Sequence, residues 1–206
     1  MRTGAWLVPR LTVALVLTAV VAGCTAQASR GGPGTNQPDM DRPAMSVTLD
    51  RDDITFLVDD YLRGLEASSF WQRSVRGASK APVVAIWPIT NASSQHIDDQ
   101  MFTVLSSIET ALVNTNAVTV VDRSRQDQLA EEVGVQNSGT FDPASAQKLG
   151  RQLGAKYFFT GKVMSVDERL NTVRRLQYSL FLQVIDIETG VIKYQNEVTR
   201  SKQLKS

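Results

Sequence analysis

The stretch Val173–Ile187, which reads VRRLQYSLFLQVIDI, decides the fold because apolar and polar side chains alternate along it. Side chains in a β-strand point to the two faces of the sheet in turn, so residues two apart share a face. Such alternation predicts a long strand with one face buried under helices and the other at least partly in contact with water. The apolar face carries Leu176, Tyr178, Leu180, Leu182 and Val184, and the other carries Arg175, Gln177, Ser179 and Gln183, interrupted by Phe181.

The residues on either side of this stretch extend the prediction to an antiparallel meander. Glu188-Thr189-Gly190 predicts a tight hairpin that leads into a strand over Val191–Arg200. Tyr157–Val166 predicts the remaining strand of the meander. Further upstream, the continuous apolar run Val83–Trp87 predicts a buried central strand, whose hydrogen bonding should end at Pro88. A short strand over 118–121 completes the predicted sheet.

Four helices are expected between these strands. In the first, Asp52 or Asp53 can cap the N-terminus, and apolar residues recur at helical spacing from Ile54 to Leu65. Gly154 closes the last helix, as a residue in the left-handed conformation does. The overall prediction is an α/β (α+β) fold, a mixed β-sheet with helices mainly on one face and a C-terminal antiparallel meander. The helices cover Asp50–Glu66, Ile97–Asn114, Ser124–Glu132 and Asp142–Gly154.

The N-terminal residues have the order of a bacterial lipoprotein signal peptide. Arg2 and Arg10 come first, a charge-free apolar run from Leu11 to Ala22 follows, and Cys24 comes directly after the small residues that end at Gly23. This pattern resembles a lipobox, in which the cysteine receives a diacylglyceryl group and becomes the N-terminus after cleavage. A transmembrane anchor is the first alternative, but the apolar run is shorter than the ~20 residues that span a bilayer. An ordinary secretory signal with a chance cysteine is the second.

These features divide the chain into three parts. Residues 1–23 are predicted to be the signal peptide, residues 24–49 the lipidated cysteine and a disordered tether, and residues 50–206 one globular domain. The tether is rich in Gly, Pro, Ser, Asn and Gln, a composition that does not form a core. Fully extended, it reaches at most ~85 Å. Two or three acyl chains at Cys24 would hold the protein stably on a membrane.

Composition and motifs argue against several functional classes. The chain of 206 residues has a formal net charge of only +1, whereas a nucleic-acid-binding protein shows a strong basic excess. Its only histidine, His96, precedes a predicted helix, where capping or contact with solvent is the simplest role. We find no nucleophile elbow, no phosphate-binding loop and no cluster typical of a metal ligand set. The sequence therefore predicts no cofactor, no metal site and no catalytic residues.

One cluster of charge remains as a candidate binding site. Arg169, Arg174 and Arg175 surround the predicted turn between the first two meander strands. They are interpreted either as the solvated end of a hairpin or as a contact patch for an acidic partner, because complementary charge accelerates encounter.

Several short strings in the chain point to a known family. They are NASSQHID (91–98), VVDR (120–123), DP (142–143), LGRQLGAKY (149–157), TG (160–161) and LQVIDIETG (182–190). Together they resemble the LpoB-type activators of penicillin-binding proteins, which are outer-membrane lipoproteins. The resemblance implies a fold like the N-terminal domain of TolB.

The resemblance also implies a function. Such a lipoprotein faces the periplasm from the outer membrane and docks on the regulatory domain of a class A penicillin-binding protein. It raises the glycosyltransferase and transpeptidase activities of that enzyme without chemistry of its own. Thr25, where a retained lipoprotein would have Asp, agrees with export to the outer membrane. The globular domain is expected to be monomeric.

The tether departs from this pattern because it is short for crossing the periplasm. Either the partner's regulatory domain projects outward, or the Asp50–Glu66 helix detaches and lengthens the reach. The alternative function is an envelope assembly or secretion-associated scaffold lipoprotein that self-associates. A cell-wall hydrolase is a third and weaker hypothesis.

Overall fold

The computed structural model of the chain describes residues 27–30, 42–44, 46–132 and 143–205. The predicted leader and Cys24 lie outside the described residues. The strands form one sheet in the order β2-β1-β7-β6-β5-β3-β4. Their bounds are β1 (Gln27–Arg30), β2 (Arg42–Ala44), β3 (Val83–Asn91), β4 (Thr119–Val120), β5 (Tyr157–Leu170), β6 (Val173–Asp186) and β7 (Ile192–Lys205). The helices are α1 (Arg51–Ala67), the π-helical turn η1 (Trp71–Arg76), α2 (Asp98–Asn114), α3 (Arg123–Glu132) and α4 (Pro143–Leu153).

The sheet is mixed, as the sequence predicts. β5, β6 and β7 pair antiparallel in sequence order and form the expected meander. β3 pairs parallel to β5 on one side and to β4 on the other. The five apolar residues of the alternating face of β6, from Leu176 to Val184, are all fully buried. The fold class and the alternation are therefore confirmed.

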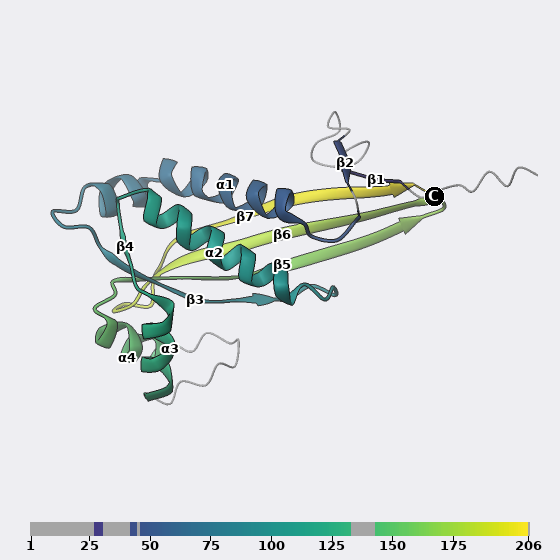
Figure 1. Cartoon of the computed structure of the whole chain (residues 1–206). Helices are drawn as coiled ribbons and strands as arrows, with labels where there is room; N and C mark the ends of the chain where they lie inside the picture. The colour runs from purple at the N-terminus through teal and green to yellow at the C-terminus, as the bar shows by residue number, and fades with distance from the viewer. Residues whose placement is uncertain (1–26, 31–41, 45, 133–142, 206) are drawn as a thin grey trace, which may run out of the picture.

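The helices lie on both faces of the sheet but cover them unequally. The long helices α1 and α2 lie side by side over the long strands, and the short helices α3 and α4 lie together near the β3 and β4 end (Figure 1). The main core fills the space under α1 and α2 and includes Tyr61, Trp71 and Tyr178. A smaller core on the opposite face packs Leu149 and Leu153 of α4 against Trp87 and Phe158. Trp71, in η1, is fully buried in the main core.

β3 continues past Pro88, where the sequence predicted its end. The strand runs to Asn91, and its register against β5 shifts between Ile86 and Ile89. Proline has no N–H to donate, and the irregularity places Pro88 outside the regular pairing. The proline therefore interrupts the ladder without ending the strand.

The segment expected to be a disordered tether contains two strands. β1 pairs antiparallel with Lys202–Lys205 of β7, and β2 pairs with the outer edge of β1. Main-chain groups at the open edge of β7 can pair with almost any extended segment, so a Gly- and Pro-rich composition does not exclude short strands. Leu49 is also buried, so the packed domain begins before the predicted boundary at residue 50.

The helix and turn ends lie where the sequence predicts them, except at the starts of α1 and α3. Gly154 after α4 has a positive φ, as predicted, and Gly190, in the predicted turn between β6 and β7, has one as well. The cap of α1 is Asp50, whose carboxylate accepts hydrogen bonds from the N–H groups of Asp52 and Asp53. α3 starts one residue before Ser124, and the carboxylate of Asp122 accepts from the N–H of Arg125. In both cases the acid that caps the helix lies just upstream of the predicted residue. Within the described residues, no helix is long and apolar enough to cross a membrane.

Candidate protein-binding surface

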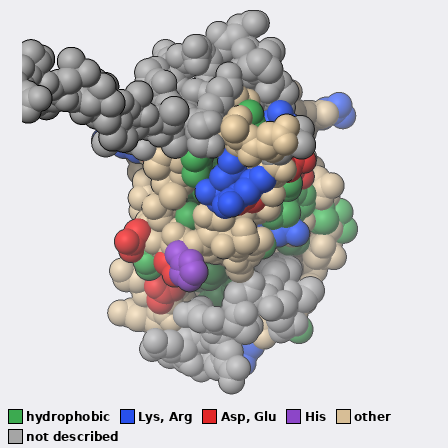
Figure 2. Space-filling model, turned by 90° about the vertical axis from the view of Figure 1, so that its right-hand side faces the viewer, with side chains coloured by type: hydrophobic (Ala, Val, Ile, Leu, Met, Phe, Trp, Pro, Cys, Tyr) green, Lys and Arg blue, Asp and Glu red, His purple; other side chains and the backbone are tan. Residues whose placement is uncertain are grey.

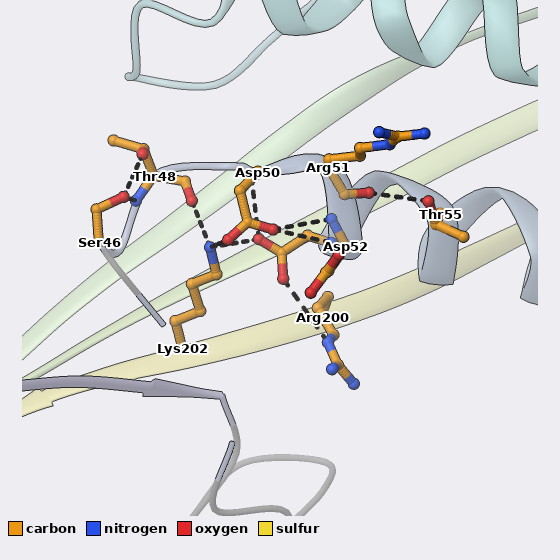
Figure 3. A network of polar contacts seen from close by, with 9 residues as sticks. Ser46, Thr48, Asp50, Arg51, Asp52, Thr55, Arg200 and Lys202 are labelled. Carbon is orange, nitrogen blue, oxygen red and sulfur yellow. Dashed lines mark hydrogen bonds and ion pairs between the residues drawn. The ribbon is translucent and has the colours of Figure 1, made fainter. Parts of the chain in front are cut away.

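A buried ion-pair cluster attaches the start of α1 to β7. Lys202, on β7, is fully buried, and its Nζ donates to Asp50 Oδ2 at 2.9 Å and to the carbonyl oxygen of Thr48 at 2.5 Å. The same Nζ forms an ion pair with Asp53, which is also fully buried. Figure 3 shows these side chains converging between the first turn of α1 and the strand. The cluster therefore determines where α1 begins and how it lies on the sheet.

Arg200 extends this cluster along β7. Its Nε lies 3.8 Å from Asp53 Oδ1, and its guanidinium group lies 4.3 Å from the centre of the Phe56 ring. Burial raises the pKa of Asp53 even though Lys202 acts to lower it. Asp53, Arg200 and Lys202 are buried and their charges are compensated within the cluster, which leaves no position for a substrate. We therefore assign it a structural role.

The arginines predicted as a contact patch lie at the opposite end of the sheet from α3 and α4. Arg174 forms two hydrogen bonds from Nε to the Asp167 carboxylate, at 2.9 Å and 3.1 Å, and a third from Nη2 at 2.5 Å. These bonds hold the pKa of Asp167 below its usual range. Figure 2 looks onto this end of the molecule and shows Lys and Arg side chains gathered near its middle.

The register of the hairpin divides the three arginines between two faces. Arg169 is opposite Arg174, and Glu168 is opposite Arg175. Because side chains alternate along a strand, Arg169 and Arg174 share the face that carries α1, and Arg175 lies on the other face. Arg175 Nη1 contacts Glu168 Oε2 there at 3.3 Å. The structure thus brings together two of the three predicted residues, which line a hollow of about 230 Å³ with Asn171 and Thr172.

A groove between α1 and α2 is the feature that the sequence analysis missed. It has a volume of about 540 Å³ and is lined by Thr55, Val58 and Asp59 of α1 and by Phe102 and Ser106 of α2, among others. Phe102 is 67% exposed. A second hollow of about 470 Å³ continues along the same two helices as far as Glu66 of α1 and Thr115 of α2. The buried residues of α2 are Val104, Ile108 and Leu112. Phe102 is apolar but lies outside this buried stripe, which is the sequence signal that could have identified it.

None of the His, Cys, Asp and Glu side chains of the described residues gather in groups of three or more that could hold a metal ion. His96 is exposed just before α2. The arginine hollow and the groove are surface hollows with exposed charged or apolar side chains, which another protein can contact.

Comparison with known proteins identifies relatives. Residues 53–199 match the family described as "Peptidoglycan-synthase activator LpoB". The C-terminal domain of LpoB from Escherichia coli has a similar fold, with a TM-score of 0.52 and 15% identity over 72% of this chain and 97% of that one. The corresponding domain from Salmonella enterica has a TM-score of 0.48 and 15% identity over 71% and 93% of the two chains. No curated protein sequence matches the chain.

Proposed function

Because the chain belongs to the LpoB family of peptidoglycan-synthase activators, we propose that it binds a class A penicillin-binding protein and raises its glycosyltransferase and transpeptidase activities. The observation that carries this proposal is the family match over 53–199, which spans α1 to β7. The activator supplies binding energy and no chemistry. Its effect is a population shift, in which it binds the active conformation of the synthase more tightly than the resting one.

The direct test is reconstitution of the purified lipoprotein with the class A synthase of its own organism. We expect faster glycan polymerisation and more peptide crosslinking in its presence. Unchanged rates together with no binding would reject the proposed function. Light scattering of the protein alone tests the scaffold alternative, because an activator of this kind is expected to be a monomer and a scaffold to form multimers.

We further propose that Cys24 carries the lipid and that the protein faces the periplasm from the outer membrane. The sequence from Arg2 to Cys24 supports this, since it has all three parts of a lipoprotein signal. While β1 is paired with β7, Cys24 can lie at most ~10 Å from Gln27, the first paired residue. In that state the domain lies close to its membrane.

Detachment of α1 does not explain a longer reach. The helix buries six apolar side chains against the sheet and α2, namely Ile54, Leu57, Val58, Tyr61, Leu62 and Leu65. At about 2 kcal/mol each, their exposure costs on the order of 10 kcal/mol, which is comparable to the stability of a whole domain. A longer reach therefore requires β1 and β2 to leave the edge of β7, and while they stay paired the synthase's regulatory domain must extend toward the outer membrane.

Cys24→Ser tests the anchor. The serine hydroxyl cannot form the thioether that holds the diacylglyceryl group, so the variant is expected to lack fatty acid and to appear in the soluble fraction. Fractionation of the envelope and mass spectrometry of the N-terminal peptide measure this. A variant that stays membrane-bound with acyl chains attached would disprove lipidation at Cys24.

We also propose that the Arg169 and Arg174 hollow contacts an acidic surface of the synthase. Arg169 is exposed, so Arg169→Glu should leave the fold intact and weaken binding about fivefold at low salt, corresponding to ~1 kcal/mol. The loss should shrink at higher salt because exposed charges are screened. Arg73→Glu, at an exposed position in η1, is the matched control. Equal binding by Arg169→Glu and the wild type would place the contact elsewhere.

A further inference from the structure

We propose that the groove between α1 and α2 docks a basic segment of the synthase that carries an apolar anchor residue. This inference rests on the proposed function and adds a second contact surface, of opposite charge to the arginine hollow. Three observations carry it: the shape of the groove, the exposed Phe102 side chain that lines it and its uncompensated acidic charge.

The groove has the shape of an elongated binding site. Thr55 of α1 and Phe102 of α2 line the first hollow, and Glu66 of α1 and Thr115 of α2 line the second. The two helices therefore run in the same direction along the groove. Figure 1 shows the two helices side by side in this orientation. From Phe102 to Thr115 the lining spans about 20 Å at 1.5 Å per residue. That length is sufficient for several turns of a helix or an extended segment of about six residues.

Two exposed apolar side chains lie on the same side of α2. Phe102 is 67% exposed and lines the groove, and Val113 is 50% exposed and lies outside the lining. Eleven residues correspond to almost exactly three helical turns, so their side chains project in nearly the same direction, about 16 Å apart. A large aromatic side chain left in water beside a hollow is typical of a contact residue, because its burial on binding is favourable. An apolar residue of the partner can therefore pack against Phe102.

The charge around the groove selects the partner. Asp59 and Glu66 line it, and Asp98 and Asp99 lie one turn before Phe102 on the same side of α2. Within the described residues, none of these four carboxylates is paired with a cation. Arg63 also lines the groove, but its guanidinium group is paired with the carboxylate of Asp60 at 3.2 Å. Parallel helices also place both negative C-terminal dipole ends at the Glu66 end. Such a surface repels phosphates and acidic segments and attracts lysine and arginine side chains.

The test uses the mature, full-length lipoprotein and the class A synthase. Asp59→Lys/Glu66→Lys reverses the charge of the groove, and Phe102→Ala removes the apolar contact. Glu188→Lys/Glu197→Lys is the matched control, since both residues are exposed and lie outside the groove. Affinity and activation are measured at 50 mM and 300 mM salt, and Tm confirms that each variant is folded.

We expect the groove reversal to weaken binding about tenfold at 50 mM salt and less at 300 mM, because exposed charges are screened. Phe102→Ala should weaken binding about tenfold at both salt concentrations. The control should bind like the wild type. Equal losses in the control would show an effect of net charge alone and would overturn the groove proposal.

The outcome separates the two proposals. If the wild type activates the synthase and both groove variants activate it equally well, the groove proposal fails and the proposed function stands. If the wild type neither binds nor activates the synthase, the proposed function fails and the groove proposal fails with it. Self-association of the wild type that is lost in the groove variants would assign the groove to a second copy of this chain and would also overturn the proposal.

Discussion

Lys202→Met will lower the free energy of unfolding by about 3 kcal/mol, the low end of the range for breaking a buried ion pair. The variant removes the ammonium group that compensates Asp53 and Asp50 at the start of α1. Both Lys202 and Asp53 are fully buried, so water cannot replace the lost partner. Arg200 stays 3.8 Å from Asp53 and limits the loss. Urea unfolding followed by circular dichroism measures the change.

Two comparisons separate the loss of the buried ion pair from a general effect of removing a positively charged side chain. Lys202→Met/Asp53→Asn removes both charges, so it should be more stable than Lys202→Met alone. Arg63→Met breaks an exposed ion pair with Asp60 and should cost less than ~0.5 kcal/mol. If Lys202→Met and Arg63→Met have the same stability, the buried cluster contributes nothing and our description of it is wrong.

The stability deficit of Lys202→Met should also depend on pH. Burial raises the pKa of Asp53, and removal of the nearby ammonium group raises it further. A carboxyl group with a higher pKa in the folded state binds more protons there than in the unfolded state, so its folded form gains stability as the pH falls. The deficit relative to the wild type should therefore shrink between about pH 7 and pH 5. A deficit that grows over this range would contradict the assignment.

Gly161→Ala will destabilise the domain by about 3 kcal/mol, because an added side chain has no space between β5 and β6. A Cβ atom at Gly161 would overlap the carbonyl oxygen of Phe181 and would lie 2.9 Å from the Cα of Leu182. These are backbone atoms of the paired strand, so the strands must separate to admit it. For a domain of this size the expected fall in Tm is roughly 10 °C.

Gly154→Ala is the control for this substitution. No atom lies within 4 Å of a Cβ at Gly154, but its φ is +66°. Only the left-handed conformation opposes alanine there, at a cost of about 1 kcal/mol. A Gly161→Ala variant as stable as Gly154→Ala would mean that β5 and β6 are farther apart than the structure places them.

Local sequence signals predicted most of the fold. The alternation from Leu176 to Val184, the glycines at 154 and 190 and the apolar stripe of α1 each depend on neighbours within a few residues, and each was confirmed. The errors at Pro88 and at the start of α1 both concern where an element begins or ends. β3 continues past the irregularity at Pro88 because its partner strand β5 continues. The cap of α1 is Asp50, two or three residues before the predicted Asp52 or Asp53.

The candidate binding surface was less predictable because it depends on register and on contacts between distant segments. Three arginines close in sequence do not make one patch when strand alternation directs Arg175 away from Arg169 and Arg174. The predicted strand ended at Arg200, so its continuation to Lys202, which pairs with an acid about 150 positions earlier in the chain, was not expected. The groove requires two helices that are separated by β3 to lie parallel.

By itself, the sequence determined the four helices, the strands from β3 to β7, the buried face of the meander and the membership of a family, because these follow from periodicity and from local strings. Only the tertiary structure decided which charges are compensated and which are available to a partner. The physical reason is that an ion pair or a groove exists only when segments far apart in the chain are brought within a few ångströms, and no local pattern encodes that distance.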